Sequence, residues 1–132
     1  MFRYISSVIV LTLGTGFPLA GWSSTELLMA EEPGCIWCAR WNAEIGPSYD
    51  KTGEGRAAPL RRADITEPKP DDIDLARPVN FTPTFILLVN GEEVDRIEGY
   101  PGEDFFWPLL GQMLEENGVS FTPNEEAVGL DQ

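Results

Sequence analysis

The sequence contains no histidine at any of its 132 positions. This absence removes the side chain that most often acts as a general base near neutral pH and that most often binds metal ions. Catalytic sites in which a histidine activates a serine or a cysteine are therefore excluded. Any nucleophile in this chain must be activated by other means.

Basic residues are also scarce, because nine lysines and arginines stand against 22 aspartates and glutamates, which gives a formal net charge of −13. A surface with this charge repels the phosphates of nucleic acids and of anionic lipids. We therefore expect no nucleic-acid partner. The length suits a single domain and leaves no room for a second catalytic one.

The chain lacks an apolar run of the roughly 20 residues that span a bilayer comfortably. Its N-terminus nevertheless has the layout of a signal peptide, with one charge at Arg3, an apolar stretch over residues 5–13 and small residues after it. We expect residues 1–21 to be this signal peptide. Because Pro18 disfavours cleavage at the end of the segment, an uncleaved anchor is the alternative. Export implies an oxidising compartment.

Only two cysteines occur, in the run Gly-Cys-Ile-Trp-Cys that ends at Cys38. An apolar stretch over residues 26–30 precedes them and predicts a buried strand. After them, Trp37, Trp41 and Ile45 recur at spacings of four and form one apolar helical stripe. The cysteines therefore open a predicted helix, which we expect Gly46-Pro47 to terminate.

The spacing of Cys35 and Cys38 suits redox chemistry, because residues three apart on a helix share a face and can close a small disulfide. Cys35 would lie at the helix N-terminus, where unpaired backbone N–H groups and the helix dipole favour a thiolate. We expect Cys35 to attack a partner and Cys38, one turn inside the helix, to resolve the intermediate. Trp37 is the aromatic residue placed best to touch that partner.

Two alternatives compete with redox chemistry. An inert structural disulfide is disfavoured, because so short a loop constrains the unfolded chain little. A copper(I) carrier is conceivable with two thiolates, but the chain offers neither a histidine nor a third cysteine to complete the site. We expect no metal and no cofactor. Within redox chemistry, the direction of electron flow stays open between a reductase and a disulfide oxidant or isomerase.

The rest of the chain predicts further strands and connections. Residues 49–58 are polar and contain glycine, so we expect a loop or a frayed helical extension. Asn90-Gly91 is a strong hairpin signal between two strands. Prolines at both ends of residues 66–78 predict a surface connection with one helical turn over 71–77. The three further strands are expected over residues 59–65, 84–89 and 93–98.

A second amphipathic helix follows, with core-facing residues from Phe106 to Leu114 and an end at Asn117-Gly118. Pro108 predicts a kink or a helix that begins only there. We expect a domain over residues 22–118 and a loose acidic tail over residues 119–132. The predicted fold is α/β, with a mixed four-stranded sheet and helices on both faces.

The run over residues 27–41 resembles the active site of the thioredoxin superfamily. Three later segments look like that family's cis-proline strand, hairpin and closing glycine: 82–85, 90–91 and 99–100. Together with residues 55–62, the pattern is most similar to the SoxS-type periplasmic thioredoxins of sulfur-oxidation operons. The resemblance implies a thioredoxin-like fold, periplasmic localisation and reductase activity. The implied partners are a protein with a disulfide or modified cysteine, of the SoxYZ kind, and a membrane electron donor.

The resemblance also implies roles for single residues. It predicts a cis peptide bond between Thr82 and Pro83, with the Thr82 backbone as a docking edge for an incoming peptide. Only about 5–6% of X-Pro bonds in folded proteins are cis, so the residue pair alone would not predict one. Met29 stands where the family has a buried carboxylate. A water molecule or Glu31 would then have to serve in the proton-transfer step.

Overall fold

A computed structural model of the chain describes Gly16 and residues 23–123. Apart from Gly16, the predicted signal segment, residues 1–21, lies outside the described residues, as does the part of the tail beyond residue 123. Within the described part, no helix has the length and apolar character needed to cross a membrane.

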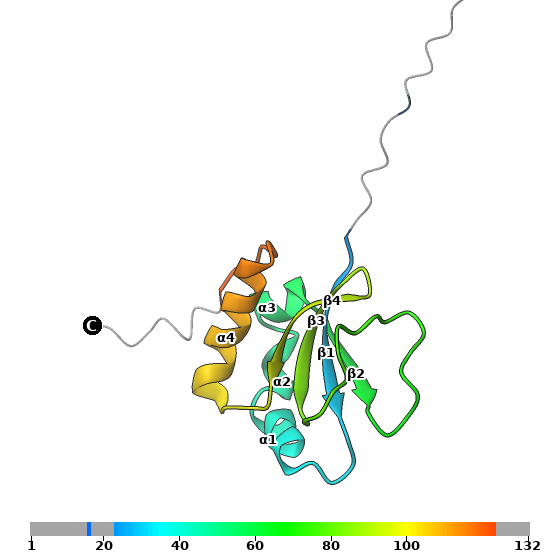
Figure 1. Cartoon of the computed structure of the whole chain (residues 1–132). Coiled ribbons are helices and arrows are strands. Elements are labelled where there is room, and N and C mark those ends of the chain that lie inside the picture. The colour runs from blue at the N-terminus through cyan, green and yellow to red at the C-terminus, as the bar shows by residue number, and fades with distance from the viewer. Residues whose placement is uncertain (1–15, 17–22, 124–132) are drawn as a thin grey trace, which may run out of the picture.

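Four strands form one mixed sheet in the order β2-β1-β3-β4 (Figure 1). The first pair is parallel and the other two pairs are antiparallel. This arrangement confirms the predicted mixed four-stranded sheet and the hairpin between the last two strands. The strands are β1 (Thr25–Glu31), β2 (Leu60–Asp64), β3 (Thr84–Val89) and β4 (Glu92–Glu98).

The described residues contain four helices, α1 (Ile36–Glu44), α2 (Gly46–Tyr49), α3 (Gly53–Ala57) and α4 (Glu103–Glu116). Gly46-Pro47 ends α1 as expected, but it also begins α2. A proline is tolerated in the first turn of a helix because the N–H that it lacks would have no intrahelical partner there. In the segment expected to be a loop or a frayed helical extension, residues 49–58, Tyr49 ends α2, a turn follows, and Gly53–Ala57 form α3.

Helix α4 begins before Pro108, which lies inside it. The alternative in which the helix begins only near this proline is therefore wrong. A phenylalanine at position 106 is buried in the core, and its burial against neighbouring rings stabilises the first turns of the helix. The predicted helix end at Asn117-Gly118 is confirmed, with Gly118 at φ +72°.

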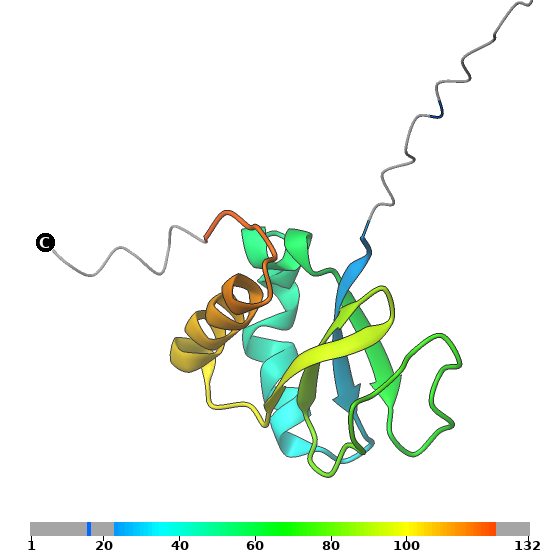
Figure 2. The same cartoon turned by 45° about the horizontal axis from the view of Figure 1, so that its top comes forward.

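The helices all pack on one face of the sheet, which corrects the expectation of helices on both faces (Figure 2). Alternate residues of a strand point to opposite faces. On β3, Phe85 and Leu87 therefore face the helices, whereas Ile86 and Leu88 face the other side. The residues that cover this second face come from the long connection between β2 and β3: Ile73, Leu75 and Val79.

This connection, residues 65–83, is an extended strap that contains no helix, so the helical turn expected over residues 71–77 is wrong. Asp74 instead forms an isolated β-bridge to Glu92, in which its N–H donates to the Gly91 carbonyl at 2.8 Å. Prolines at four positions of the strap lack the backbone N–H that a helix needs. The strap therefore satisfies its backbone by pairing with the hairpin.

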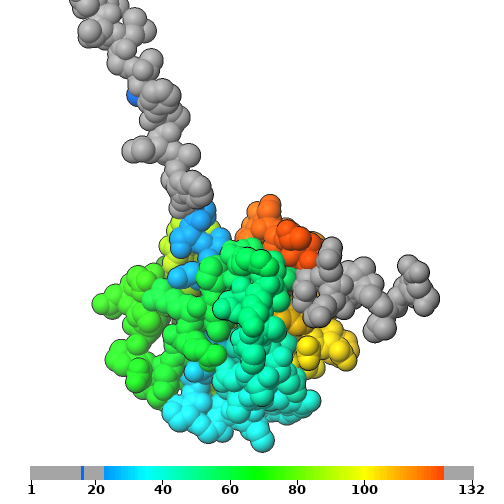
Figure 3. Space-filling view, turned by 180° about the vertical axis from the view of Figure 1, so that it is seen from behind, coloured from blue at the N-terminus to red at the C-terminus, as the bar shows by residue number. Residues whose placement is uncertain are grey.

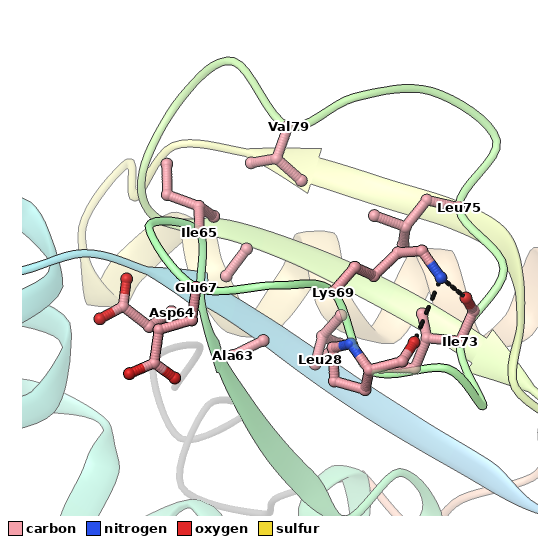
Figure 4. Close-up of a pocket in the computed structure, with 11 residues that line it drawn as sticks. Leu28, Ala63, Asp64, Ile65, Glu67, Lys69, Ile73, Leu75 and Val79 are labelled. Carbon is pink, nitrogen blue, oxygen red and sulfur yellow. Dashed lines mark hydrogen bonds between the residues drawn. The ribbon is translucent and has the colours of Figure 1, made fainter.

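A partly enclosed apolar pocket of about 170 Å³ lies between the strap and the sheet (Figure 4). The Lys69 ammonium group donates hydrogen bonds to the carbonyls of Pro70 and Ile73 beside it. The apolar lining of the pocket includes Leu28, Ala63, Ile65, Ile73, Leu75 and Val79.

Gly91 is a point where the strap and the hairpin touch, and Gly91→Ala should lower stability by about 3 kcal/mol. The residue has φ +80°, and an added Cβ would lie 2.3 Å from the backbone oxygen of Asp72. Gly118→Ala is the matched control, because φ is also positive there but nothing lies within 4 Å of the added Cβ. Its expected cost is about 1 kcal/mol. Equal losses for both variants in urea unfolding would contradict this contact.

The start of the predicted acidic tail is packed, not loose. Val119 and Phe121 lie against the main core, and the Val119 N–H donates to the Leu114 carbonyl at 2.9 Å. These two apolar side chains extend the packed domain beyond residue 118, because they cover core surface that α4 leaves open.

Candidate active site

The two cysteines lie at the start of α1 and form a disulfide, with their Cα atoms 5.2 Å apart. Cys35 is the N-cap of the helix, in extended conformation, and its sulfur accepts a hydrogen bond from the Cys38 N–H at 3.1 Å. Gly34, at φ +78°, turns the chain from the end of β1 into the helix. The predicted position of the pair at a helix N-terminus is confirmed.

The two sulfurs differ in accessibility. Cys38 is 4% exposed and belongs to the main core, whereas Cys35 is only partly buried at its edge. Ile36 and Trp37, between them in sequence, are 75% and 49% exposed. The beginning of α1 lies at the surface at one end of the molecule (Figure 3). A visiting molecule can therefore reach the outer sulfur from a side that is largely apolar.

The Thr82-Pro83 peptide bond is cis, as the resemblance implied. Antiparallel pairing of Ala30 with Thr84 brings the segment before β3 beside the segment that follows β1. There the Thr82 hydroxyl donates to Glu32 Oε1 at 2.7 Å, which joins the cis-proline segment to the loop that carries the cysteines. Pro83 is buried and Thr82 is partly exposed.

Phe81 is a surface residue that the sequence-based reasoning did not select. It precedes the Thr82-Pro83 pair and is 60% exposed. Exposed aromatic residues on soluble proteins often mark contact surfaces. Its position next to the proline pair was the available signal, but nothing in the local pattern showed that its ring would be left outside the core.

Arg62 is a residue that sequence reasoning did not select, and its guanidinium contacts Met29 and Glu31. One guanidinium nitrogen lies 3.6 Å from the sulfur of the fully buried Met29 and 2.6 Å from Glu31 Oε2, and the other donates to Asn42 at 2.8 Å. The same group lies over the ring of Trp41, 5.8 Å from its centroid. Arg62 thus fastens β1, β2 and α1 together. The Glu31 carboxylate is engaged in this ion pair.

On the outer side of α1, Glu44 binds two partners that sequence reasoning did not connect. Arg40 Nε donates to one carboxylate oxygen at 2.7 Å, and the Tyr100 hydroxyl donates to the other at 2.6 Å. The hydrogen bond from Arg40, followed by that from Tyr100, lowers the pKa of Glu44. Burial, together with the hydrogen bond to this carboxylate, raises the pKa of Tyr100 well above its usual value. Near neutral pH, Glu44 is therefore ionised and Tyr100 is neutral.

Among the described residues, no cluster of three or more histidine, cysteine, aspartate or glutamate side chains could hold a metal ion. What the arrangement offers chemically is a dithiol–disulfide couple with one accessible and one shielded sulfur.

No protein-family model and no curated protein matches the chain. Among solved structures, the chain is similar to the reduced periplasmic thioredoxin SoxS from Paracoccus pantotrophus, at 54% sequence identity and a TM-score of 0.70. The match covers 71% of this chain and 99% of that one. The chain therefore belongs to the thioredoxin superfamily, among the SoxS-type periplasmic thioredoxins, and is a periplasmic thiol–disulfide oxidoreductase.

Proposed function

We propose that this chain reduces a disulfide or a modified cysteine on a protein partner, with Cys35 as the attacking thiolate and Cys38 as the resolving thiol. The observation that carries the proposal is the unequal burial of the two sulfurs at one helix N-terminus. A partly exposed sulfur can meet a substrate, while a buried one can attack only the intermediate formed next to it. Helix N–H groups favour the thiolate form of the outer sulfur, so histidine is not needed.

The reaction starts from the reduced dithiol. The Cys35 thiolate attacks one sulfur of the substrate disulfide, which breaks that bond and releases the other sulfur as a thiolate. Cys38, after loss of its proton to solvent, then attacks Cys35 Sγ and displaces the second substrate sulfur. Two electrons have moved to the substrate, and the Cys35–Cys38 disulfide remains. This oxidised form is the one that the structure contains.

The docking site in this proposal consists of Trp37, Thr82 and Pro83, of which Trp37 and Thr82 reach the surface and Pro83 is buried next to Thr82. The hydrogen bond from the Thr82 hydroxyl to Glu32 keeps Thr82 beside the cysteine loop, where an extended substrate segment can pair with its backbone. The half-exposed indole of Trp37 offers apolar area next to Cys35. Main-chain pairing and one aromatic contact suit a flexible peptide better than a small rigid molecule.

The partner in this proposal is a cysteine-bearing carrier of the sulfur-oxidation system, of the SoxYZ kind, and electrons come from a membrane thiol donor. Support comes from the similarity to a periplasmic thioredoxin called SoxS. A dithiol in an oxidising compartment must be reduced again after each turnover, so a donor is required. The N-terminal residues 1–21 would direct export or anchor the protein.

The redox potential tests the direction of this reaction. Ile36 and Trp37 place neither a charge nor an imidazole between the cysteines, so no side chain there depresses the thiol pKa strongly. We expect equilibration with glutathione to give a potential of about −270 mV, as in thioredoxin. A value of about −120 mV, as in a strong disulfide oxidant, would contradict the reductase assignment.

A further inference from the structure

Helix α1 carries two tryptophans one turn apart, and a guanidinium group lies over each. Arg62 covers Trp41, which is fully buried, at 5.8 Å from the ring centroid. Arg40 covers Trp37, which is half exposed, at 5.6 Å. The inner pair lies against the core and joins three elements of the fold. The outer pair, Arg40 and Trp37, stays largely exposed and joins no strand. Packing of the core therefore does not explain why these two side chains lie together.

Arg40 is itself held in place from the protein interior. Its Nε donates to Glu44 Oε1 at 2.7 Å, and Glu44 Oε2 accepts the Tyr100 hydroxyl at 2.6 Å. Tyr100 is 7% exposed and belongs to the main core. In the sequence it lies in the loop between β4 and α4. The contacts from Tyr100 through Glu44 to Arg40 therefore connect the rigid core to the exposed indole of Trp37.

An exposed tryptophan normally samples several rotamers, and fixing it costs free energy when a partner binds. A guanidinium on one ring face restricts those rotamers before binding and leaves the other parts of the ring open. Trp37 lies two residues after Cys35, at the place where a substrate sulfur must arrive. A ring fixed in advance at this place lowers the cost of docking.

We propose that Arg40 is a positioning residue that holds Trp37 as a preorganised platform for the peptide segment of a protein substrate. The inference rests on the proposed function, since it assumes attack by Cys35 on a docked protein. A small disulfide reaches Cys35 without covering the indole. The platform should therefore matter for protein substrates and not for small ones.

The test compares two substrates, insulin as the protein disulfide and oxidised glutathione as the small one, with dithiothreitol as the reductant that regenerates the dithiol and with the rate in the absence of the enzyme subtracted. With Arg40→Gln we expect KM for insulin to rise roughly twofold to fivefold, the range of an exposed cation–π contact. We expect kcat for insulin and both constants for glutathione to stay unchanged. Lys51→Gln is the control, because this exposed lysine carries the same charge, whereas the cation–π contact of Trp37 is with Arg40.

Two further variants separate positioning from charge. Tyr100→Phe removes only the hydroxyl that holds Glu44, so it should raise KM for insulin by less than Arg40→Gln does. Trp37→Ala should raise it at least as much, and adding Arg40→Gln to it should change nothing further. Additive effects, or an equal KM rise with glutathione, would overturn the inference. Failure of the proposed function would look different, because the wild-type protein would then reduce neither substrate.

Discussion

Cys35→Ala should lower the reduction of a protein disulfide by on the order of a thousandfold or more, because it removes the nucleophile itself. Cys38→Ala should behave differently. It keeps the attacking thiolate, so the first bond exchange still takes place, but no sulfur remains to release the substrate. This variant should accumulate as a mixed disulfide with its partner.

The measurement is non-reducing electrophoresis of each variant after incubation with a protein disulfide, followed by mass spectrometry of the adduct. Trapping in periplasmic extract would also identify the natural partner. The variant that lacks both cysteines is the control, since it should neither react nor trap. A Cys35→Ala protein that retains wild-type reduction, or that forms the adduct through Cys38, would refute the assigned roles.

Arg96→Met should destabilise the fold by about 3 kcal/mol, the lower end for breaking a buried ion pair. The side chains of Arg96 and Glu93 are 4% and 3% exposed, and the guanidinium binds both carboxylate oxygens, at 2.5 and 2.8 Å. It also donates to the carbonyls of Arg77 and Pro78, which belong to the strap. The substitution would leave a buried carboxylate without its counter-charge.

The loss of stability caused by Arg96→Met should become smaller as the pH falls. Burial by itself opposes the charge on Glu93, but the hydrogen bonds from Arg96 and the Ala76 N–H outweigh it, so the pKa of Glu93 is lowered. In the wild type this pair therefore contributes stability above the usual glutamate pKa, and the contribution fades as the pH falls through the lowered value. In Arg96→Met the unpaired carboxylate gains from protonation.

The difference in stability between wild type and Arg96→Met should accordingly shrink between pH 7 and about pH 4, where a glutamate ordinarily takes up its proton. Urea unfolding at several pH values measures it. The double variant Glu93→Met with Arg96→Met is the control, because removal of both charges is often close to neutral. A single variant as stable as the wild type at pH 7 would show that the pair is unimportant.

Local sequence patterns were enough to predict the reactive pair and most of the sheet. The helix start at Cys35 follows from a strand, a glycine turn and an apolar stripe, which are neighbours in the sequence. The hairpin at Asn90-Gly91 depends on two residues that accept positive φ, observed at +53° and +80°. Such features are decided by neighbours a few positions away, so a single sequence exposes them.

The face on which each element packs was not predictable in this way. Four prolines and a bridge from Asp74 to Glu92 made the strap extended, and the helical turn expected over residues 71–77 did not form. Whether a short polar segment prefers a helical turn or pairing with a distant hairpin depends on what the hairpin offers. The choice between these two conformations depends on tertiary contacts, and local helix propensity alone does not decide it.

By itself, the sequence determined that two cysteines would lie at the start of one helix, beside a strand and ahead of a proline pair. Only the tertiary structure decided what surrounds them. Arg62 reaches Glu31 across 31 positions, and Tyr100 reaches Glu44 across 56. Side chains so far apart in the chain meet because strand pairing and core packing bring their backbones together, and no local pattern records which partners will face each other.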